Sequence, residues 1–464
     1  MGVVVRLETV RQQGEVERWR QRGYEAVDEM VAKLRDEIEG KDFEALSAVL
    51  GREGQKLTGA LFEEVLKSRG AKERTRDTHV CEDCGRTLKR QKRLHTKTAE
   101  SRHGEVRIER PYFYCKHCRR GYYPLDRALG MAPERKQYDL QRAAAELFSE
   151  VPHERASQIF ERLTGVKLSN HCMHELASQM GESADVVRGL PNRQRVGAII
   201  EEAGNGRVWR PVLVVASDGA DVPTRPEADS RAEKRGPGEW KEAKGFRIYL
   251  VGQERIEQIL SWHQIATEEE FGEAIRFAAT LIPVAQVRVA LLGDGAKWLW
   301  THMRAAFPTG KEILDYYHGS ERIHKVAQIQ YNQDQNQQAL WIESTLARLN
   351  FGEVESVIWG LQRMRPASPA AEEEIRKLIG YLKNNAHRVN YRSFKRGQYP
   401  RGSGGIESAN KFICHVRMKR SGAWWYVING NKMLRLRCAF YNDTFDEVFA
   451  RYKRLQRFAL ERID

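Results

Sequence analysis

The stretch Val212-Leu213-Val214-Val215-Ala216-Ser217-Asp218-Gly219 decides how the rest of this 464-residue chain is interpreted. Its first half is a short apolar, β-branched run, which is typical of a buried strand. The run stops at an aspartate followed by a glycine, so we expect a carboxylate at the tip of the strand with flexible backbone beside it. The pattern recurs at Val287-Arg288-Val289-Ala290-Leu291-Leu292-Gly293-Asp294-Gly295. The sequence therefore predicts two strand-end aspartates, Asp218 and Asp294.

A third carboxylate, Glu407, follows the glycine-rich loop Arg401-Gly402-Ser403-Gly404-Gly405 and opens a helical pattern. Each acidic residue alone has an ordinary explanation, because Asp-Gly after a strand is usually a turn and Glu near a helix start compensates the helix dipole. Together, three hard oxygen ligands suit Mg²⁺ or Mn²⁺. A pair of such ions is a common means of in-line attack on a phosphodiester.

Composition indicates a basic protein large enough for two to four domains. It has 77 Lys and Arg against 63 Asp and Glu, a net charge of +14, and 41% hydrophobic residues. This balance favours a polyanionic partner, most commonly nucleic acid, over a merely soluble basic protein. No apolar run approaches the roughly 20 residues of a membrane helix, and the N-terminus lacks a signal-peptide pattern. We expect a soluble cytoplasmic protein with no membrane partner.

Four of the seven cysteines form two Cys-x-x-Cys pairs, Cys81/Cys84 and Cys115/Cys118. Two matched knuckles favour a structural Zn²⁺ site over a redox pair or disulfides, and indicate a zinc ribbon. Residues 96–101 and 105–114 between the pairs suit a hairpin with its turn at His103-Gly104. Its basic residues, which include Arg90 and Arg93, are suited to contact DNA phosphates. An equally weighted alternative is that they form the solvent-exposed face of a strand.

The remaining segments give a coarse order of elements. Residues 137–181 suit a helix-turn-helix with Ser169 capping its third helix, although an ordinary helical hairpin has comparable weight. The other expectations are helices over residues 8–70, a linker over 189–206, a strand over 244–252, a helix over 267–280, a strand-like run over 311–317, helices over 320–390, a helix from Ile406, and a basic closing helix over 448–462.

Six blocks of sequence, in order, resemble bacterial insertion-sequence transposases of the ISKra type, within the Mutator-like group of DDE transposases. They are Cys81-Glu82-Asp83-Cys84-Gly85; Glu109-Arg110-Pro111-Tyr112; Tyr122-Tyr123-Pro124-Leu125-Asp126; Ser217-Asp218-Gly219 with Val222-Pro223-Thr224-Arg225; Gly293-Asp294-Gly295-Ala296-Lys297-Trp298; and Leu314-Asp315-Tyr316-Tyr317-His318 with Gly402-Ser403-Gly404-Gly405-Ile406-Glu407-Ser408. The resemblance runs from the ribbon to about residue 440 and says little about residues 1–75.

The resemblance implies a multidomain α/β protein with an RNase H-like core, a helical insertion, and a catalytic triad of Asp218, Asp294 and Glu407. Asp315 and His318 are similar to the Asp/Cys-x-x-His motif of the group. The expected regions are an N-terminal helical region (1–75), a zinc ribbon (76–130), a helix-turn-helix (131–188), the first part of the core (205–320), the helical insertion (321–395), and the glutamate helix with basic C-terminal helices (396–464).

The implied function is DNA transposition by a bacterial, nucleoid-associated enzyme. It would bind double-stranded terminal inverted repeats, cleave at each end and join the freed 3′-hydroxyl to target DNA, acting as a homodimer or larger assembly. The expected DNA contacts beyond Glu407 are Lys411, Arg417, Lys419 and Arg420, although Lys411 could instead pair with Glu407. His318 has a structural alternative too, as a buried residue capping the following helix. The alternatives are a nuclease or resolvase of the same fold that does not join strands, and a domesticated, non-catalytic DNA-binding regulator.

Overall fold

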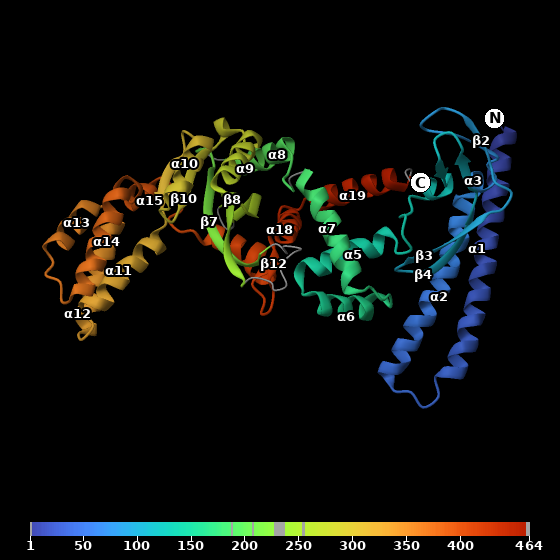
Figure 1. The fold of residues 1–464 in the computed structure, drawn as a ribbon, viewed down its shortest axis with the longest axis horizontal. Coiled ribbons are helices and arrows are strands. Elements are labelled where there is room, and N and C mark those ends of the chain that lie inside the picture. Colours follow the sequence, from blue (N-terminus) through green and yellow to red (C-terminus); the bar gives the residue numbers. More distant parts are fainter. Residues whose placement is uncertain (1, 187–188, 207, 227–236, 253–255, 461–464) are drawn as a thin grey trace. The chain divides into compact units, whose positions relative to one another are not determined.

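The computed structural model describes residues 2–186, 189–206, 208–226, 237–252 and 256–460 (Figure 1). The chain is a mixed α/β, multidomain protein, and it divides into two compact units. Unit 1 comprises Met1–Ser183 with Phe449–Asp464, and unit 2 comprises Ala184–Val448. Among the described helices, none combines the length and the apolar character needed to cross a bilayer.

Unit 1 begins with a helical hairpin, α1 (Gly2–Glu37) and α2 (Phe43–Arg69), followed by the single turn α3 (Ala71–Arg74). The predicted N-terminal helices are therefore confirmed. Asp42 caps α2, because its carboxylate accepts a hydrogen bond from the Ala45 N–H at 2.9 Å. Phe62 and Leu66 of α2 pack against a small apolar core that includes Ile108 of the following hairpin.

The cysteine region contains three short hairpins: β1 (Thr78–Val80) with β2 (Thr87–Lys89), β3 (His95–Ser101) with β4 (Gly104–Arg110), and β5 (Phe113–Cys115) with β6 (Arg120–Tyr122). The predicted turn at His103-Gly104 is present. The predicted second limb, residues 105–114, is wrong as one strand, because β4 ends at Arg110 and β5 begins at Phe113. Pro111 separates them, and proline has no N–H to donate to a strand ladder.

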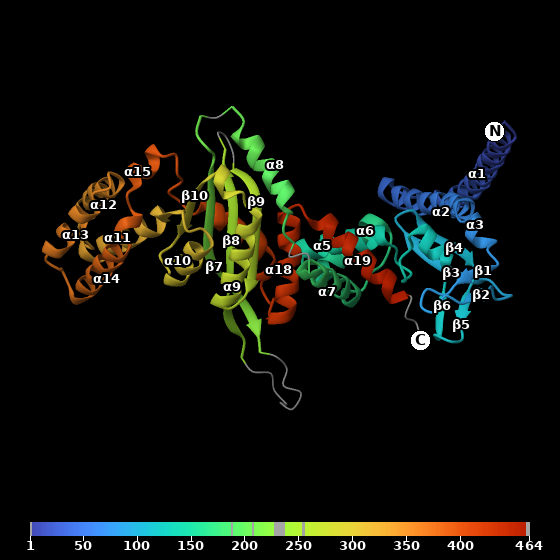
Figure 2. The ribbon, with the colours of Figure 1, turned by 90° about the horizontal axis from the view of Figure 1, so that it is seen from above.

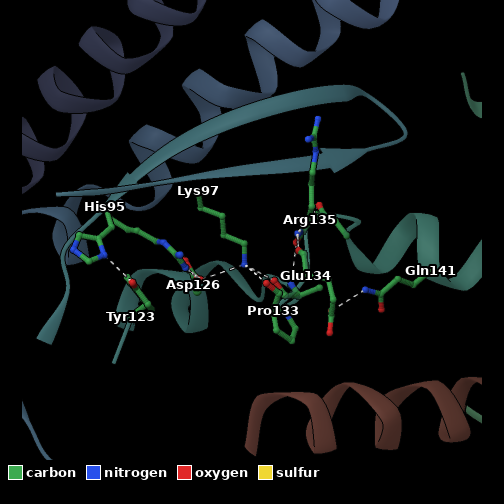
Figure 3. Close-up of polar contacts among 11 residues, drawn as sticks. His95, Lys97, Tyr123, Asp126, Pro133, Glu134, Arg135 and Gln141 are labelled. Atoms are coloured by element: carbon green, nitrogen blue, oxygen red, sulfur yellow. Dashed lines mark hydrogen bonds and ion pairs between the residues drawn. The ribbon is translucent and has the colours of Figure 1, made fainter. Parts of the chain in front are cut away.

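A buried ionic cluster fixes the β3–β4 hairpin to the segment after it (Figure 3). The Lys97 ammonium donates to the Ala132 carbonyl at 2.5 Å and the Pro133 carbonyl at 3.1 Å, and lies 3.3 Å from the carboxylate of Asp126. Arg110 also pairs with Asp126, and its guanidinium lies 3.6 Å from the centre of the Tyr123 ring. Asp126 belongs to α4 (Pro124–Leu129). Burial lowers the pKa of Lys97, but the opposite charge of Asp126 compensates part of that cost.

Three helices follow, as predicted: α5 (Tyr138–Glu150), α6 (His153–Thr164) and α7 (Asn170–Val186), of which α7 belongs to unit 1 up to Ser183. Gly165 ends α6 in the left-handed conformation, with φ of 69°. The Ser169 hydroxyl accepts a hydrogen bond from the Cys172 N–H at 3.2 Å, so the predicted cap is present. The last helix, α19 (Phe445–Leu460), belongs to unit 1 from Phe449 onward, and its Tyr452 hydroxyl donates to Gln141 at 3.0 Å. The final two residues of the predicted closing helix lie outside the described residues.

Unit 2 opens with α8 (Arg193–Gly204), where the sequence predicted a linker. That prediction is wrong. Asn192 caps the helix by accepting from the Arg195 N–H at 2.9 Å, and Val196 and Ile200 on successive turns are buried. The burial of two apolar residues at helical spacing therefore stabilises this helix despite the low helix propensity of its interior glycine, Gly197.

A mixed sheet forms the core of unit 2 (Figure 2). Its strands are β7 (Val212–Arg225), β8 (Glu239–Val251), β9 (Ile256–Ile265), β10 (Arg288–Gly293), β11 (Lys311–Leu314) and the short β12 (Trp425–Tyr426). The spatial order is β11-β10-β7-β8-β9, with β12 paired to the far end of β7. β10 is parallel to β7 and β11, whereas β8 is antiparallel to β7 and β9. The strand β9 was not predicted.

The strand β7 does not end at Asp218, and the predicted strand tip there is wrong. β7 continues to Arg225 because β8 pairs with it beyond Asp218, from Gly219 opposite Lys244 to Thr224 opposite Glu239. The ladder with β10, by contrast, stops at Ala216 opposite Leu292. Asp218 therefore lies within a long strand, beside the point where the neighbouring parallel strand β10 ends.

Helices cover the sheet on both faces. On one face lie α9 (Glu268–Leu281), capped by Thr267, and α10 (Lys297–Ala306), with Phe271 against Phe246 of β8. The sheet is also contacted by α16 (Gly404–Ala409), a π-helical segment η3 (Asn410–His415), and α18 (Val427–Tyr441), with α17 (Val416–Met418) between the last two. Because strand side chains alternate between faces, Gly245 faces away from Phe246 and α9.

The predicted helical insertion between β11 and Glu407 is present. It contains α11 (Tyr316–Gln330), α12 (Gln335–Asn350), α13 (Val354–Arg363), α14 (Pro369–Asn385) and α15 (Tyr391–Arg396), and the short 3₁₀ turn Ala386–Arg388 precedes α15. A second 3₁₀ turn, Val284–Gln286, precedes β10. Figures 1 and 2 show α11 to α14 standing to one side of the sheet within unit 2.

Candidate functional site

Three aspartates stand at one level of the sheet. β10 pairs with β7 so that Leu292 is opposite Ala216, and with β11 so that Gly293 is opposite Leu314. Continuing these two registers puts Asp294 beside Asp218 on one side and beside Asp315 on the other. The carboxyl ends of β10 and β11 thus place Asp294 and Asp315 level with Asp218, which lies inside the longer strand β7.

The glycine-rich loop brings Glu407 to this edge. The backbone N–H of Ser403 donates to the Asp315 carboxylate at 2.9 Å, and the Ser403 hydroxyl donates to the Glu407 carboxylate. Arg247 of β8 donates to the carbonyl of Gly405 at 2.7 Å. A Cβ on Gly405 would lie 2.6 Å from the Tyr249 ring, so glycine is needed for this close approach.

Asp218 is a partly buried carboxylate, and each of its two oxygens accepts a hydrogen bond. Its Oδ1 accepts from the Gly219 N–H at 2.8 Å, and its Oδ2 accepts from the side-chain amide of Asn410 at 2.8 Å. Burial raises the pKa of Asp218 to about 6, and the charges of Asp294 and Glu407 add to the increase while His318 opposes it. Mutually repelling carboxylates fit a divalent cation with oxygen ligands.

Asp315, His318 and Glu407 form a group able to hold a metal ion, since their candidate ligand atoms lie within 4.8 Å of one another. Asp315 caps α11, accepting from the Tyr317 N–H at 2.6 Å. His318 is therefore in the first turn of a helix, on the face of Asp315, which is the helical arrangement that the sequence left open. The His318 side chain is 38% exposed. Asp315, rather than His318, caps the helix, so the structural alternative for His318 is not supported.

Unit 1 holds a second candidate metal centre, the cluster of Cys81, Cys84, Cys115 and Cys118. The sulfurs of Cys81 and Cys118 are 3.8 Å apart, and those of Cys84 and Cys115 are 3.7 Å apart. A tetrahedral site with metal–sulfur distances of about 2.3 Å has edges of about 3.8 Å. Burial opposes ionisation of Cys81, but hydrogen bonds from the Tyr122 hydroxyl and nearby backbone N–H groups outweigh it and lower the pKa of Cys81 to about 6. Thiolate character is what a metal ligand requires.

The predicted DNA contacts fall into two classes. Lys411, Lys419 and Arg420 are exposed in unit 2, and Arg90 and Arg93 are exposed in unit 1. Arg417 differs, because it is 2% exposed.

The prediction that Arg417 contacts DNA is therefore corrected. Its guanidinium lies 4.9 Å from the centre of the Trp425 ring, in the interior of unit 2. The π-helical segment precedes Arg417 and shifts the helical phase, so spacing from Glu407 alone did not reveal which basic residues face outward.

Two polar residues of the site were missed from the sequence. Asn410 contacts Asp218, and His263 contacts Asn410. Asn410 could have been found, because it lies three residues after Glu407 and residues at that spacing share a helix face. His263 gave no such signal, because its contact spans 147 residues and depends on the order of the strands.

Comparison with models of protein families and with curated proteins gives no match. Among solved structures, the chain is similar to one described as "Drosophila P element transposase strand transfer complex". The identity is 11%, the match covers 70% of this chain and 81% of that chain, and the TM-score is 0.26. A similarity at this level carries no argument about the fold or function of the present chain.

Proposed function

We propose that the chain is a DDE transposase, a metal-dependent enzyme that cleaves DNA and joins a 3′-hydroxyl to a target strand. The observation that supports the proposal is the electrostatic interaction of Asp218 with Asp294 and Glu407, which together with burial raises the pKa of Asp218. The sequence resemblance to the ISKra type supplies the finer assignment. The mixed sheet with its helical insertion supports the RNase H-like core that the resemblance implies.

The donor set fits Mg²⁺ or Mn²⁺, with Asp218, Asp294 and Glu407 as the residues that would hold it. When bound, such ions activate the attacking oxygen and stabilise the leaving oxygen of a phosphodiester. His318 is placed to donate a hydrogen bond to a phosphate oxygen or to orient the attacking group. Asp315 would act mainly by holding Ser403 and, through it, Glu407.

The cysteine cluster would hold a structural Zn²⁺, and the ribbon, with Arg90 and Arg93 exposed, would contact DNA. The helices α5 to α7 would add a helix-turn-helix, and Lys411, Lys419 and Arg420 would contact phosphates near the carboxylates. Double-stranded DNA, comprising element ends and target, is the proposed partner, and two or more copies would act together on it.

The decisive experiment incubates the full chain with Mg²⁺, duplex DNA carrying the terminal repeats of its element, and a supercoiled target plasmid. The proposal expects repeat ends joined through their 3′-hydroxyls to the plasmid, which sequencing of the junctions would detect. Cleaved ends without junctions would instead indicate a nuclease or resolvase. Specific binding without any cleavage would indicate a non-catalytic regulator.

A further inference from the structure

Asp218 stands at the end of a row of three residues that crosses three strands. In the register of the sheet, Asp218 of β7 is opposite Gly245 of β8, and Gly245 is opposite His263 of β9. Directly opposed residues of antiparallel strands point to the same face. His263 and Asp218 therefore share a face, with a glycine between them.

The glycine makes room for the histidine ring. A Cβ on Gly245 would lie 2.3 Å from Cδ2 and 2.5 Å from Nε2 of His263, closer than non-bonded atoms approach. The imidazole thus occupies the space above Gly245 and extends across β8 toward β7. It is fully buried, with 0% exposure. Any other residue at 245 would force the ring away from Asp218.

Asn410 links the ring to the carboxylate. Its Oδ1 lies 2.9 Å from His263 Nε2, and its Nδ2 donates to Asp218 Oδ2 at 2.8 Å. Asn410 is 3% exposed, so water does not compete for these bonds. An ionised carboxylate only accepts, so the amide must turn its nitrogen to Asp218 and its oxygen to His263. Nε2 of His263 then carries the proton and donates.

The ring is suited to this fixed role because it stays neutral. Burial lowers the pKa of His263 to about 4, so the imidazole holds one N–H and no charge at neutral pH. A neutral donor orients the amide without adding a positive charge that would compete with a cation at Asp218. Asn410 also begins the π-helical segment that follows the helix of Glu407. Segments of this kind are frequent at functional sites.

We propose that His263 and Asn410 are positioning residues that hold the Asp218 carboxylate in the orientation needed to bind a divalent cation, and that Gly245 is required to admit His263. This inference rests on the proposed function, because it assumes that Asp218 is a metal ligand. In this arrangement Asp218 would be the metal ligand, and Asn410 and His263 would act through it. Partners that orient a metal ligand change metal affinity or activity by about 10–100-fold when they are removed.

The test is Mn²⁺ binding to the full chain, followed by electron paramagnetic resonance, with thermal unfolding measured on the same samples. Asn410→Ala and His263→Leu should each weaken Mn²⁺ binding by about 10-fold or more. His263→Gln keeps an N–H donor that can reach the Asn410 oxygen, so it should remain within a few-fold of the unaltered chain. Gly245→Ala changes neither hydrogen-bonding residue, yet should weaken binding like His263→Leu because it displaces the ring.

Asn442→Ala is the matched control. Asn442 is also a buried amide that bonds to β9, accepting from the Ser261 N–H at 2.6 Å and donating to the Ser261 carbonyl at 2.9 Å. Its removal should lower the unfolding temperature while leaving Mn²⁺ affinity unchanged. A loss of affinity in Asn442→Ala equal to that in Asn410→Ala would overturn the inference, because destabilisation alone would then explain both.

Asp218→Ala distinguishes a failure of the positioning role from a failure of the proposed metal site. If Asp218→Ala leaves Mn²⁺ binding intact, the proposed metal site itself is wrong. If Asp218→Ala abolishes binding while Asn410→Ala and Gly245→Ala bind normally, the metal site stands and the positioning role is overturned. If Asp218→Ala, Asn410→Ala and Gly245→Ala all lose Mn²⁺ affinity while His263→Gln retains it, the metal site and the positioning role are both supported.

Discussion

Removing the charge of Asp218 should stabilise the protein in the absence of Mg²⁺. The pKa of Asp218 rises from 3.8 to about 6 on folding, chiefly because of burial. A tenfold change in an acid dissociation constant corresponds to about 1.4 kcal/mol, so keeping Asp218 ionised costs the folded state about 3 kcal/mol well above pH 6. Asp218→Asn keeps the shape and removes this cost. An amide has one acceptor oxygen, so one of the two hydrogen bonds that Asp218 accepts is lost, which costs about 1 kcal/mol and leaves a net gain of about 2 kcal/mol at pH 8.

The direction in which the stability contribution of Asp218 changes with pH follows from its raised pKa. Between pH 3.8 and about 6 the folded chain binds the Asp218 proton more tightly than the unfolded chain. The favourable contribution of Asp218 is therefore fully present below pH 3.8 and is lost as pH rises through about 6. The advantage of Asp218→Asn should accordingly shrink by about 1.5 kcal/mol on going from pH 8 to pH 5.

Urea unfolding followed by tryptophan fluorescence measures this difference. Trp19 is the sole tryptophan in the sequence of unit 1, and the other nine of the ten belong to unit 2, so the signal reports the unit that contains Asp218. The buffer should lack Mg²⁺ but contain no chelator, which would remove metal from the cysteine cluster. An Asp218→Asn chain that is less stable than the unaltered one at pH 8, or a difference that is the same at pH 5 and pH 8, would refute the reasoning.

Three further outcomes are expected. Metal analysis should find one zinc per chain, and Cys115→Ser should lose it and unfold the ribbon, since structural zinc contributes on the order of 10 kcal/mol to small domains; a folded ribbon without zinc would count against this. DNA affinity should fall steeply between low and physiological salt, with a shallower slope in Lys411→Ala and Lys419→Ala, because phosphate contacts release counterions; a flat dependence would exclude a backbone-dominated mode. His318→Ala should cut strand cleavage by roughly 10²-fold with unchanged melting temperature and DNA binding, the scale of a proton-transfer or positioning group; normal cleavage, or simple unfolding, would give His318 a structural role.

Local patterns predicted most elements where apolar periodicity was strong. The run from Val212 and the capping residue Ser169 lie in the predicted strand and helix start. The end of β7 was mispredicted because Asp218-Gly219 is typical of a turn, whereas six further residues, from Gly219 to Thr224, pair with β8 and extend the strand. Such pairing is a property of two distant segments, and no local window contains it.

The polar support of the site was less predictable than its carboxylates. Glu407 follows an identifiable glycine loop, but the contact of His263 with Asn410 requires β9 to lie next to β8 and the π-helical segment to cross the same face. The surroundings of Arg417 were also not predictable from local sequence. Its basic character suggested a DNA contact, but tertiary packing buries it against Trp425. The chemistry of a side chain can be identified in the sequence, but its surroundings depend on the fold.

The most direct measurement is Mg²⁺-dependent cleavage of element-end DNA by the full chain and by Asp218→Ala, Asp294→Ala and Glu407→Ala, each matched for DNA binding. The account predicts strand cleavage by the unaltered chain and none by the three variants, with binding to the DNA retained in all four. Cleavage at the unaltered rate by any one variant would remove that residue from the site, and cleavage by all three would contradict the account.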